Sequence, residues 1–113
     1  MSVILKIAMP INRVQVYELL QTVPVGRVTT YKLLAEAVGT KGYRAIGAIV
    51  RTNPNPPTIP CHRVVSSSGQ IGGFMGETSG TSIEAKKKLL ASEGVKCNQG
   101  KIVDFGSLIY SFN

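Results

Sequence analysis

The segment Asn53-Pro54-Asn55-Pro56-Pro57 constrains the fold more than any other part of the chain. Prolines remove backbone donors and disfavour a helical conformation in the preceding residue, so no helix or central strand can pass through this segment. It therefore ends any helix before it and forms a rigid loop. The loop delivers the chain to the run Ile59-Pro60-Cys61-His62-Arg63-Val64-Val65, which holds the only histidine of the sequence.

Two short helical patterns precede this loop. Thr29–Thr30 can cap a helix that continues to about Val38, and Gly39 suits the left-handed position that follows a helix. The link Thr40–Gly42 leads to a second helix over about Tyr43–Thr52. Two short helices joined by a tight turn containing glycine predict a helix-turn-helix unit. The apolar side of the first helix is expected to comprise Leu33, Leu34, Ala37 and Val38.

The second helix has two chemically different faces. Residues at i, i+3, i+4 and i+7 share one face of a helix, and here they are Arg44, Gly47, Ala48 and Arg51. The opposite face is expected to hold Ala45, Ile46, Ile49 and Val50. Two cations separated by very small residues suit close entry into a narrow groove. The alternative is that Gly47 and Ala48 permit close packing of another helix, and the spacing leaves both interpretations open.

Weaker patterns lie near the two ends of the chain. Val3–Ile7 predicts an edge strand. Asn12 resembles a helix cap, and Pro24 ends the helical pattern that follows it. The apolar positions of that pattern are Val16, Leu19, Leu20 and Val23.

A last helix is predicted from Ser82 as its cap through Glu93, with Gly94 as its stop. Its expected core contacts are Ile83, Leu89 and Leu90, and Lys86–Lys88 are expected on a solvated face. Val95–Asn113 contains short apolar pieces that have no firm assignment.

Charge and length narrow the function classes. Thirteen Lys and Arg against six Asp and Glu give a formal charge of +7, which attracts polyanions such as nucleic acid. No segment approaches the ~20 apolar residues that span a bilayer, so no membrane partner is expected. The N-terminus lacks a signal-peptide layout, which favours an intracellular protein. The 113 residues suit one compact domain, residues 1–113.

Cys61 and His62 are the candidate chemical groups. A free thiol has a pKa of about 8.5, so a nearby base must raise its nucleophilicity at neutral pH. Neighbours on an extended strand point to opposite faces, so contact would need a turn or a bridging water. One of six carboxylates could orient the imidazole, and spacing does not select one. The alternative is a buried structural cysteine beside a surface histidine. A disulfide with Cys97 is not expected in an intracellular chain, and no metal-ligand spacing is present.

Pro60-Cys61-His62-Arg63-Val64 resembles the active-site signature of the O6-alkylguanine-DNA alkyltransferases. The resemblance covers about Asn12–Gly94 and includes, in the same order and spacing, Val28-Thr29-Thr30-Tyr31, Arg44-Ala45-Ile46-Gly47, Asn53-Pro54, Ser67-Ser68-Gly69 and Leu89-Leu90-Ala91-Ser92-Glu93-Gly94. It implies a mainly α fold, a small winged helix-turn-helix-like domain with short β elements. The family's usual N-terminal domain has no counterpart in the sequence. The implied location is the cytoplasm, or the nucleus of a eukaryote.

The resemblance also implies roles for individual residues. Cys61 accepts the alkyl group, His62 takes its proton through a water, and Glu93 orients His62. Asn53 holds the recognition helix against the active-site loop, and Tyr31 donates to N3 of the extruded guanine. The chain then acts as a monomer that is consumed in one turnover, without cofactor or metal.

The implied partner is double-stranded DNA containing O6-alkylguanine, bound through the minor groove. Arg44 matches an arginine finger that fills the gap left by the flipped base. The other implied DNA-binding residues are Tyr31, Thr30, Gly47, Ala48 and Arg51, and the implied pocket residues are Val64, Phe74, Met75 and Pro56.

Three features depart from the family pattern. Phe74 stands where a tyrosine is frequent, Met75 stands where a serine is common, and Thr78–Ser82 resembles a short insertion. The main alternative function is a non-enzymatic alkyltransferase-like lesion binder, a class that lacks the reactive cysteine. A plain helix-turn-helix regulator would not need Cys61 and His62, and a cysteine hydrolase would need an oxyanion hole and repeated turnover.

Overall fold

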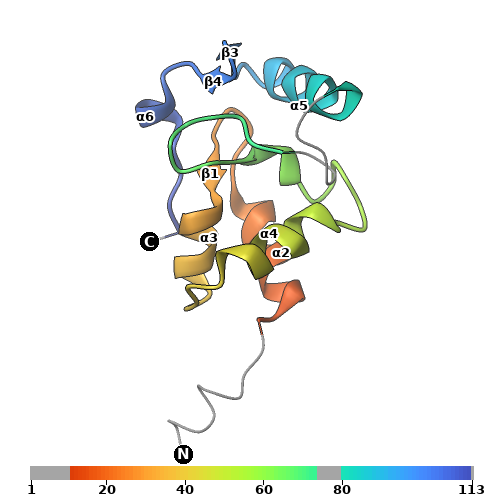
Figure 1. Ribbon diagram of the computed structural model, residues 1–113, viewed down its shortest axis with the longest axis vertical. Coiled ribbons are helices and arrows are strands. Elements are labelled where there is room, and N and C mark those ends of the chain that lie inside the picture. Colours follow the sequence, from red (N-terminus) through yellow and green to blue (C-terminus); the bar gives the residue numbers. More distant parts are fainter. Residues whose placement is uncertain (1–10, 74–79, 113) are drawn as a thin grey trace, which may run out of the picture.

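A computed structural model describes residues 11–73 and 80–112 (Figure 1). Helix α2 (Arg13–Thr22) begins at Asn12, whose side-chain oxygen accepts hydrogen bonds from the backbone N–H groups of Val14 and Gln15. The predicted cap is therefore confirmed, and the helix ends before Pro24. The strand expected at Val3–Ile7 lies outside the described residues.

Helices α3 (Tyr31–Ala37) and α4 (Tyr43–Arg51) form the predicted helix-turn-helix unit. The Thr30 hydroxyl accepts from the Leu33 N–H, so Thr30 is the cap of α3. Gly39 follows α3 with φ +77°, the left-handed conformation that glycine adopts without a steric cost. The two helices pack directly against each other, with α2 behind α4.

The core-facing residues of these helices differ from the expectation in three places. Along α3 the core-facing stripe is Tyr31, Leu34, Ala35 and Val38, which follows the i, i+3, i+4, i+7 spacing, and Leu34 and Ala35 are its fully buried members. Leu33 and Ala37 lie off that stripe, with Leu33 half-buried and Ala37 exposed. In α4 the buried residues are Ile46, Ile49 and Val50. Ala45 is exposed because its position in the helical turn lies to the side of this buried stripe.

A small parallel sheet connects the helical unit to the cysteine segment. Strand β1 (Thr29–Thr30) pairs with β2 (Val64–Val65), so that Thr29 lies opposite Val64. The 3₁₀ helix η1 (Cys61–Arg63) comes immediately before β2. This pairing places the start of α3 beside the turn that carries Cys61.

Helix α5 (Thr81–Ser92) begins two residues earlier than expected. Gly80, with φ +84°, is its N-cap in place of Ser82, because the chain enters the helix through this left-handed glycine. The helix ends at Glu93, and Gly94 follows with φ +86°, as predicted.

The segment without a firm assignment forms a hairpin, a short helix and a returning tail. Strands β3 (Cys97–Asn98) and β4 (Lys101–Ile102) pair antiparallel, and α6 (Phe105–Leu108) follows. The tail then returns to the first sheet, where Ile109 bridges Val28 in parallel. Figure 1 shows α5, the hairpin and α6 at one end of the molecule and α2, α3 and α4 towards the other.

One hydrophobic core joins these parts, with residues from α2, α3, α4, both sheets and α5. The mainly helical fold with short strands confirms the predicted fold class. Within residues 11–73 and 80–112, no helix combines the length and hydrophobicity that a membrane span requires.

Candidate active site

Cys61 sits in a tight turn between two anchored segments. It is 3% exposed and is the first residue of η1. Asn53, which follows the C-cap of α4, is buried and donates from Nδ2 to the Ile59 carbonyl at 2.6 Å. Its Oδ1 accepts from the Asn55 N–H at 2.9 Å. Asn53 thus ties the end of α4 to the loop that leads into Cys61.

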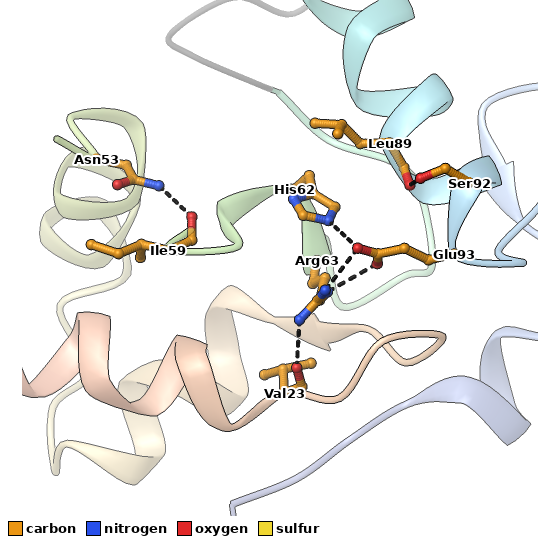
Figure 2. Close-up of polar contacts among 8 residues, drawn as sticks. All are labelled: Val23, Asn53, Ile59, His62, Arg63, Leu89, Ser92 and Glu93. Carbon is orange, nitrogen blue, oxygen red and sulfur yellow. Dashed lines mark hydrogen bonds and ion pairs between the residues drawn. The ribbon is translucent and has the colours of Figure 1, made fainter. Parts of the chain in front are cut away.

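His62 and Glu93 meet across a large separation in sequence. His62 Nε2 lies 2.9 Å from Glu93 Oε2 (Figure 2), and His62 is 2% exposed. The carboxylate can only accept, so Nε2 carries the hydrogen. Nδ1 is then the unprotonated nitrogen of the neutral ring. It is buried and has no hydrogen-bond partner among the described residues.

Burial and the neighbouring Glu93 have opposite effects on the pKa of His62. Burial lowers its pKa most, the hydrogen bond and charge of Glu93 raise it, and the charges of Arg63 and Lys86 lower it. The net pKa lies below the ordinary value of 6.5. The imidazole is therefore a neutral base at neutral pH, with an available lone pair on Nδ1.

The Cys61 thiol is protonated at neutral pH. Burial raises its pKa above the ordinary value, although a hydrogen bond from Asn53 and the charge of Lys86 lower it. A protonated thiol is a weak nucleophile, so an attack by Cys61 needs a base that removes its proton. His62, the next residue of the same turn, is the candidate for such a base.

Arg63 is a site residue to which sequence reasoning gave no role. Its Nε donates to Glu93 Oε1 at 2.9 Å and its Nη2 to Oε2 at 2.7 Å (Figure 2). Its Nη1 donates to the Val23 carbonyl at 2.7 Å. Burial raises the pKa of Glu93, but hydrogen bonds from Arg63 and His62 and their charges bring it below its ordinary value. Glu93 is therefore an ion at neutral pH.

Lys86 contradicts the expected solvated face of Lys86–Lys88. It is 0% exposed, and its ammonium donates to the carbonyls of Val64, Ile71 and Gly73 at 2.7, 2.6 and 2.9 Å. Burial lowers its pKa to about 8, so it stays charged at neutral pH. The sequence did carry a signal, because Lys86 shares the buried stripe of α5 with Ile83 and Leu90.

The residues near the thiol include Tyr31, at the start of α3. Tyr31 is half-buried, and burial, then the charge of Cys61, raises its pKa. A tyrosine with a raised pKa keeps its proton and can donate a hydrogen bond. Thr30, expected to bind DNA, is 2% exposed, and its hydroxyl already accepts from the Leu33 N–H as the cap of α3.

We define the basic face as Arg44, Gly47, Ala48 and Arg51 of α4. Arg44 and Arg51 are exposed, and the two small residues are half-buried. A Cβ added at Gly47 would meet no atom within 4 Å. Helix packing therefore does not explain this glycine, whereas close approach of an external ligand would use the open space.

The expected pocket residues are only partly described. Val64 is buried and its carbonyl accepts from Lys86, and Pro56 is half-buried in the proline loop. Phe74 and Met75 lie outside the described residues, as do the first two residues of the expected insertion Thr78–Ser82, and the remaining three form the cap and start of α5. Both cysteines are free thiols. The described ranges contain no group of three or more His, Cys, Asp or Glu side chains that could hold a metal ion.

Comparison with known proteins identifies the family. Residues 12–95 match the family model described as 6-O-methylguanine DNA methyltransferase, DNA binding domain. Proteins named methylated-DNA--protein-cysteine methyltransferase are similar, with 49% identity over 75 residues in Pyrobaculum aerophilum and 43% over 84 residues in Homo sapiens. These alignments cover 66% and 74% of this chain but 47% and 38% of the relatives. The chain thus spans less than half the length of these relatives.

Solved structures agree in fold. The O6-methylguanine-DNA methyltransferase of Pyrococcus kodakaraensis is 41% identical with a TM-score of 0.64, over 80% of this chain and 50% of that one. S. pombe Atl1, in complex with damaged DNA containing O6-carboxymethylguanine, is 25% identical with a TM-score of 0.75. That alignment covers 88% of this chain and 94% of Atl1.

Proposed function

The chain belongs to the family of 6-O-methylguanine DNA methyltransferase DNA-binding domains, and we propose that it repairs DNA by moving an alkyl group from O6-alkylguanine to Cys61. The observation that carries this proposal is the cluster of a buried thiol and a neutral imidazole in η1 with an ionised carboxylate at the end of α5. The names of the relatives support the same reaction.

The proposed step is a displacement at the alkyl carbon. The Cys61 sulfur forms a bond to that carbon while the bond from the carbon to guanine O6 breaks. The thiol proton passes to His62 Nδ1, directly or through a water, and Glu93 stabilises the resulting imidazolium. The electron pair leaves on guanine, where a donor such as the Tyr31 hydroxyl stabilises the developing charge. The guanine anion then takes up one proton from solvent and the imidazolium loses its proton to solvent, so that charge and protons balance.

The product explains why the protein would act once. A thioether is a poor leaving group, and none of the groups described around Cys61 provides a route that restores the thiol. The proposed reaction therefore consumes one protein per lesion and uses no cofactor. Cys61, His62 and Glu93 come from the same chain, which supports action as a monomer.

The basic face supports a proposed mode of DNA binding. A lesion inside a duplex is stacked, so the base must be flipped out before a buried thiol can reach it. Small residues flanked by Arg44 and Arg51 suit the minor groove, and Arg44 is the proposed finger that fills the vacated stack. Asn53 connects this helix to the Cys61 loop, so the proposed DNA-binding helix and the reactive cysteine keep a fixed relative position.

The alternative is lesion binding without chemistry. The structure of Atl1 is a complex with damaged DNA, and the similarity over nearly the whole of that chain favours lesion binding. A binding module, however, does not require a protonated thiol beside a neutral imidazole that is held by a carboxylate. Alkyl transfer uses all three groups, so we prefer it.

The two functions separate in a Cys61→Ala variant. We expect it to transfer no alkyl group but to bind duplex DNA containing O6-methylguanine within about twofold of the wild-type affinity, because the basic face is untouched. Cys97→Ala is the matched control and should react at the wild-type rate. Labelled-methyl transfer and fluorescence anisotropy measure the two properties. Transfer by Cys61→Ala, or none by wild type, would exclude the proposal.

Arg44 and Arg51 test base flipping against simple charge attraction. Arg44→Ala should slow repair of duplex DNA roughly tenfold or more, because the inserted side chain offsets part of an extrusion cost of a few kcal/mol. Its reaction with free O6-benzylguanine should change little, provided the pocket admits that base. Arg51→Ala should mainly weaken binding and reduce its salt dependence. Single-turnover rates on both substrates decide, and equal losses for Arg44→Ala on both would reject the finger role.

A further inference from the structure

Arg63 and His62 share one carboxylate. Glu93 Oε2 lies 2.9 Å from His62 Nε2 and 2.7 Å from Arg63 Nη2, while Oε1 accepts from Arg63 Nε. The guanidinium therefore holds both oxygens of Glu93 in a two-point geometry that lysine cannot reproduce. The carboxylate reaches His62 already fixed in position and already paired with a cation.

The low exposure of this cluster makes the pairing strong. The side chains of Arg63 and Glu93 are 12% and 13% exposed, and His62 is 2% exposed. Charges that are largely removed from water are screened little, so each affects its neighbours strongly. An unpaired Glu93 at 2.9 Å would favour the imidazolium form of His62 and raise the pKa of the ring.

We propose that Arg63 is a positioning residue for alkyl transfer, which fixes Glu93 against His62 and keeps His62 neutral so that Nδ1 can accept the Cys61 proton. This inference rests on the proposed function. An imidazolium has no lone pair and cannot act as the base. Arg63 thus limits the attraction between Glu93 and His62 before the reaction, while Glu93 remains in place to stabilise the proton once it arrives.

Three charged groups act on the pKa of His62. Glu93 comes from the end of α5 and raises the pKa of His62, whereas Lys86 of α5 and Arg63 of η1 lower it. Lys86 bonds three carbonyls and not the carboxylate. Arg63 is therefore the cation whose removal changes the charge of the Glu93 cluster itself.

A purely structural role is the competing explanation. Arg63 Nη1 also donates to the Val23 carbonyl at the end of α2, so a variant could lose stability without any effect on the chemistry. Arg27 offers a matched control, because it donates to the Leu108 and Ile109 carbonyls and, among the described residues, forms no hydrogen bond or ion pair with Glu93. Arg27→Gln removes the same chemical group from a backbone anchor elsewhere.

The single histidine makes the test direct. NMR titration of the His62 ring in the full chain should show a higher pKa in Arg63→Gln than in wild type and an intermediate one in Arg63→Lys. Single-turnover alkyl transfer by Arg63→Gln should be roughly fivefold slower than wild type near pH 6 and within about twofold near pH 8, because the neutral base returns as pH rises. Arg27→Gln should lower stability and leave the His62 titration unchanged.

An unchanged His62 titration in Arg63→Gln, with a rate loss that does not vary with pH, would overturn the inference. If Arg63→Gln does not fold, Arg63→Lys alone must raise the pKa of His62, and a wild-type value there would equally overturn it. The titration needs no alkyl transfer. Failure of the proposed function would instead appear as a wild-type protein that never reacts, whatever the titration shows.

Discussion

Glu93→Gln is expected to slow single-turnover alkyl transfer by roughly a hundredfold or more, the scale at which positioned general bases act. The amide lacks the charge that stabilises an imidazolium at His62, and it cannot accept from Arg63 at both ends as a carboxylate does. His62→Ala should produce a loss of the same order because it removes the base itself. Rapid-quench kinetics at saturating protein measure the effect.

Glu84→Gln is the matched control for this prediction. Glu84 lies on the same helix, is exposed, and forms only a surface ion pair with Lys87 at 3.1 Å. Its replacement should change the rate by less than about twofold, since exposed pairs contribute little. Comparable losses in Glu84→Gln and Glu93→Gln, or normal rates in His62→Ala, would remove the proton relay from the mechanism.

Lys86→Met is expected to lower the free energy of unfolding by about 3 kcal/mol or more. It leaves the carbonyls of Val64, Ile71 and Gly73 without their ammonium donor, at about 1–3 kcal/mol for each unsatisfied buried acceptor. These carbonyls belong to the segment that follows Cys61, so the lost hydrogen bonds would destabilise the part of the chain next to the active site. Urea denaturation followed by circular dichroism measures it.

Lys88→Met provides the comparison for Lys86→Met. Both variants remove one positive charge from α5, but Lys88 is exposed and its loss should stay within about 0.5 kcal/mol. Equal changes in the two variants would mean that the buried hydrogen bonds of Lys86 contribute no net stability.

Local chemistry made most of the helices predictable. Asn12 and Thr30 cap α2 and α3 through side-chain hydrogen bonds, and Pro24 and Gly39 end them. These signals act within a few residues, so the sequence displays them without knowledge of the fold. Gly80 escaped prediction because a left-handed glycine at the start of a helix is an unusual cap, and Ser82 offered a more familiar one.

Contacts between distant residues were not predictable from spacing. His62 and Glu93 are 31 positions apart, and residue patterns alone left six acids as partners for the imidazole. The resemblance to a family supplied Glu93, and the structure places it in hydrogen-bond contact. Arg63 gave no separate signal, because an arginine beside a histidine does not reveal that both reach the same carboxylate.

Lys86 and the C-terminal tail show two different reasons for missed structure. Lys86 was hidden within a run of three lysines, although its spacing from Ile83 and Leu90 placed it on the buried stripe. The tail has no periodicity to detect, because it is held by backbone hydrogen bonds with Val28 and by hydrogen bonds from the Arg27 side chain. Such short pairings depend on packing that only the complete fold supplies.

The central claim is that Cys61 accepts one alkyl group and is not regenerated. The most direct measurement incubates the protein with excess duplex DNA containing O6-methylguanine, weighs the intact chain and maps its peptides. We predict one added methyl group per chain, located on Cys61 and absent from Cys97, with an equal number of lesions repaired. Repair of many lesions per chain, an adduct on Cys97, or bound but unmodified protein would contradict the account.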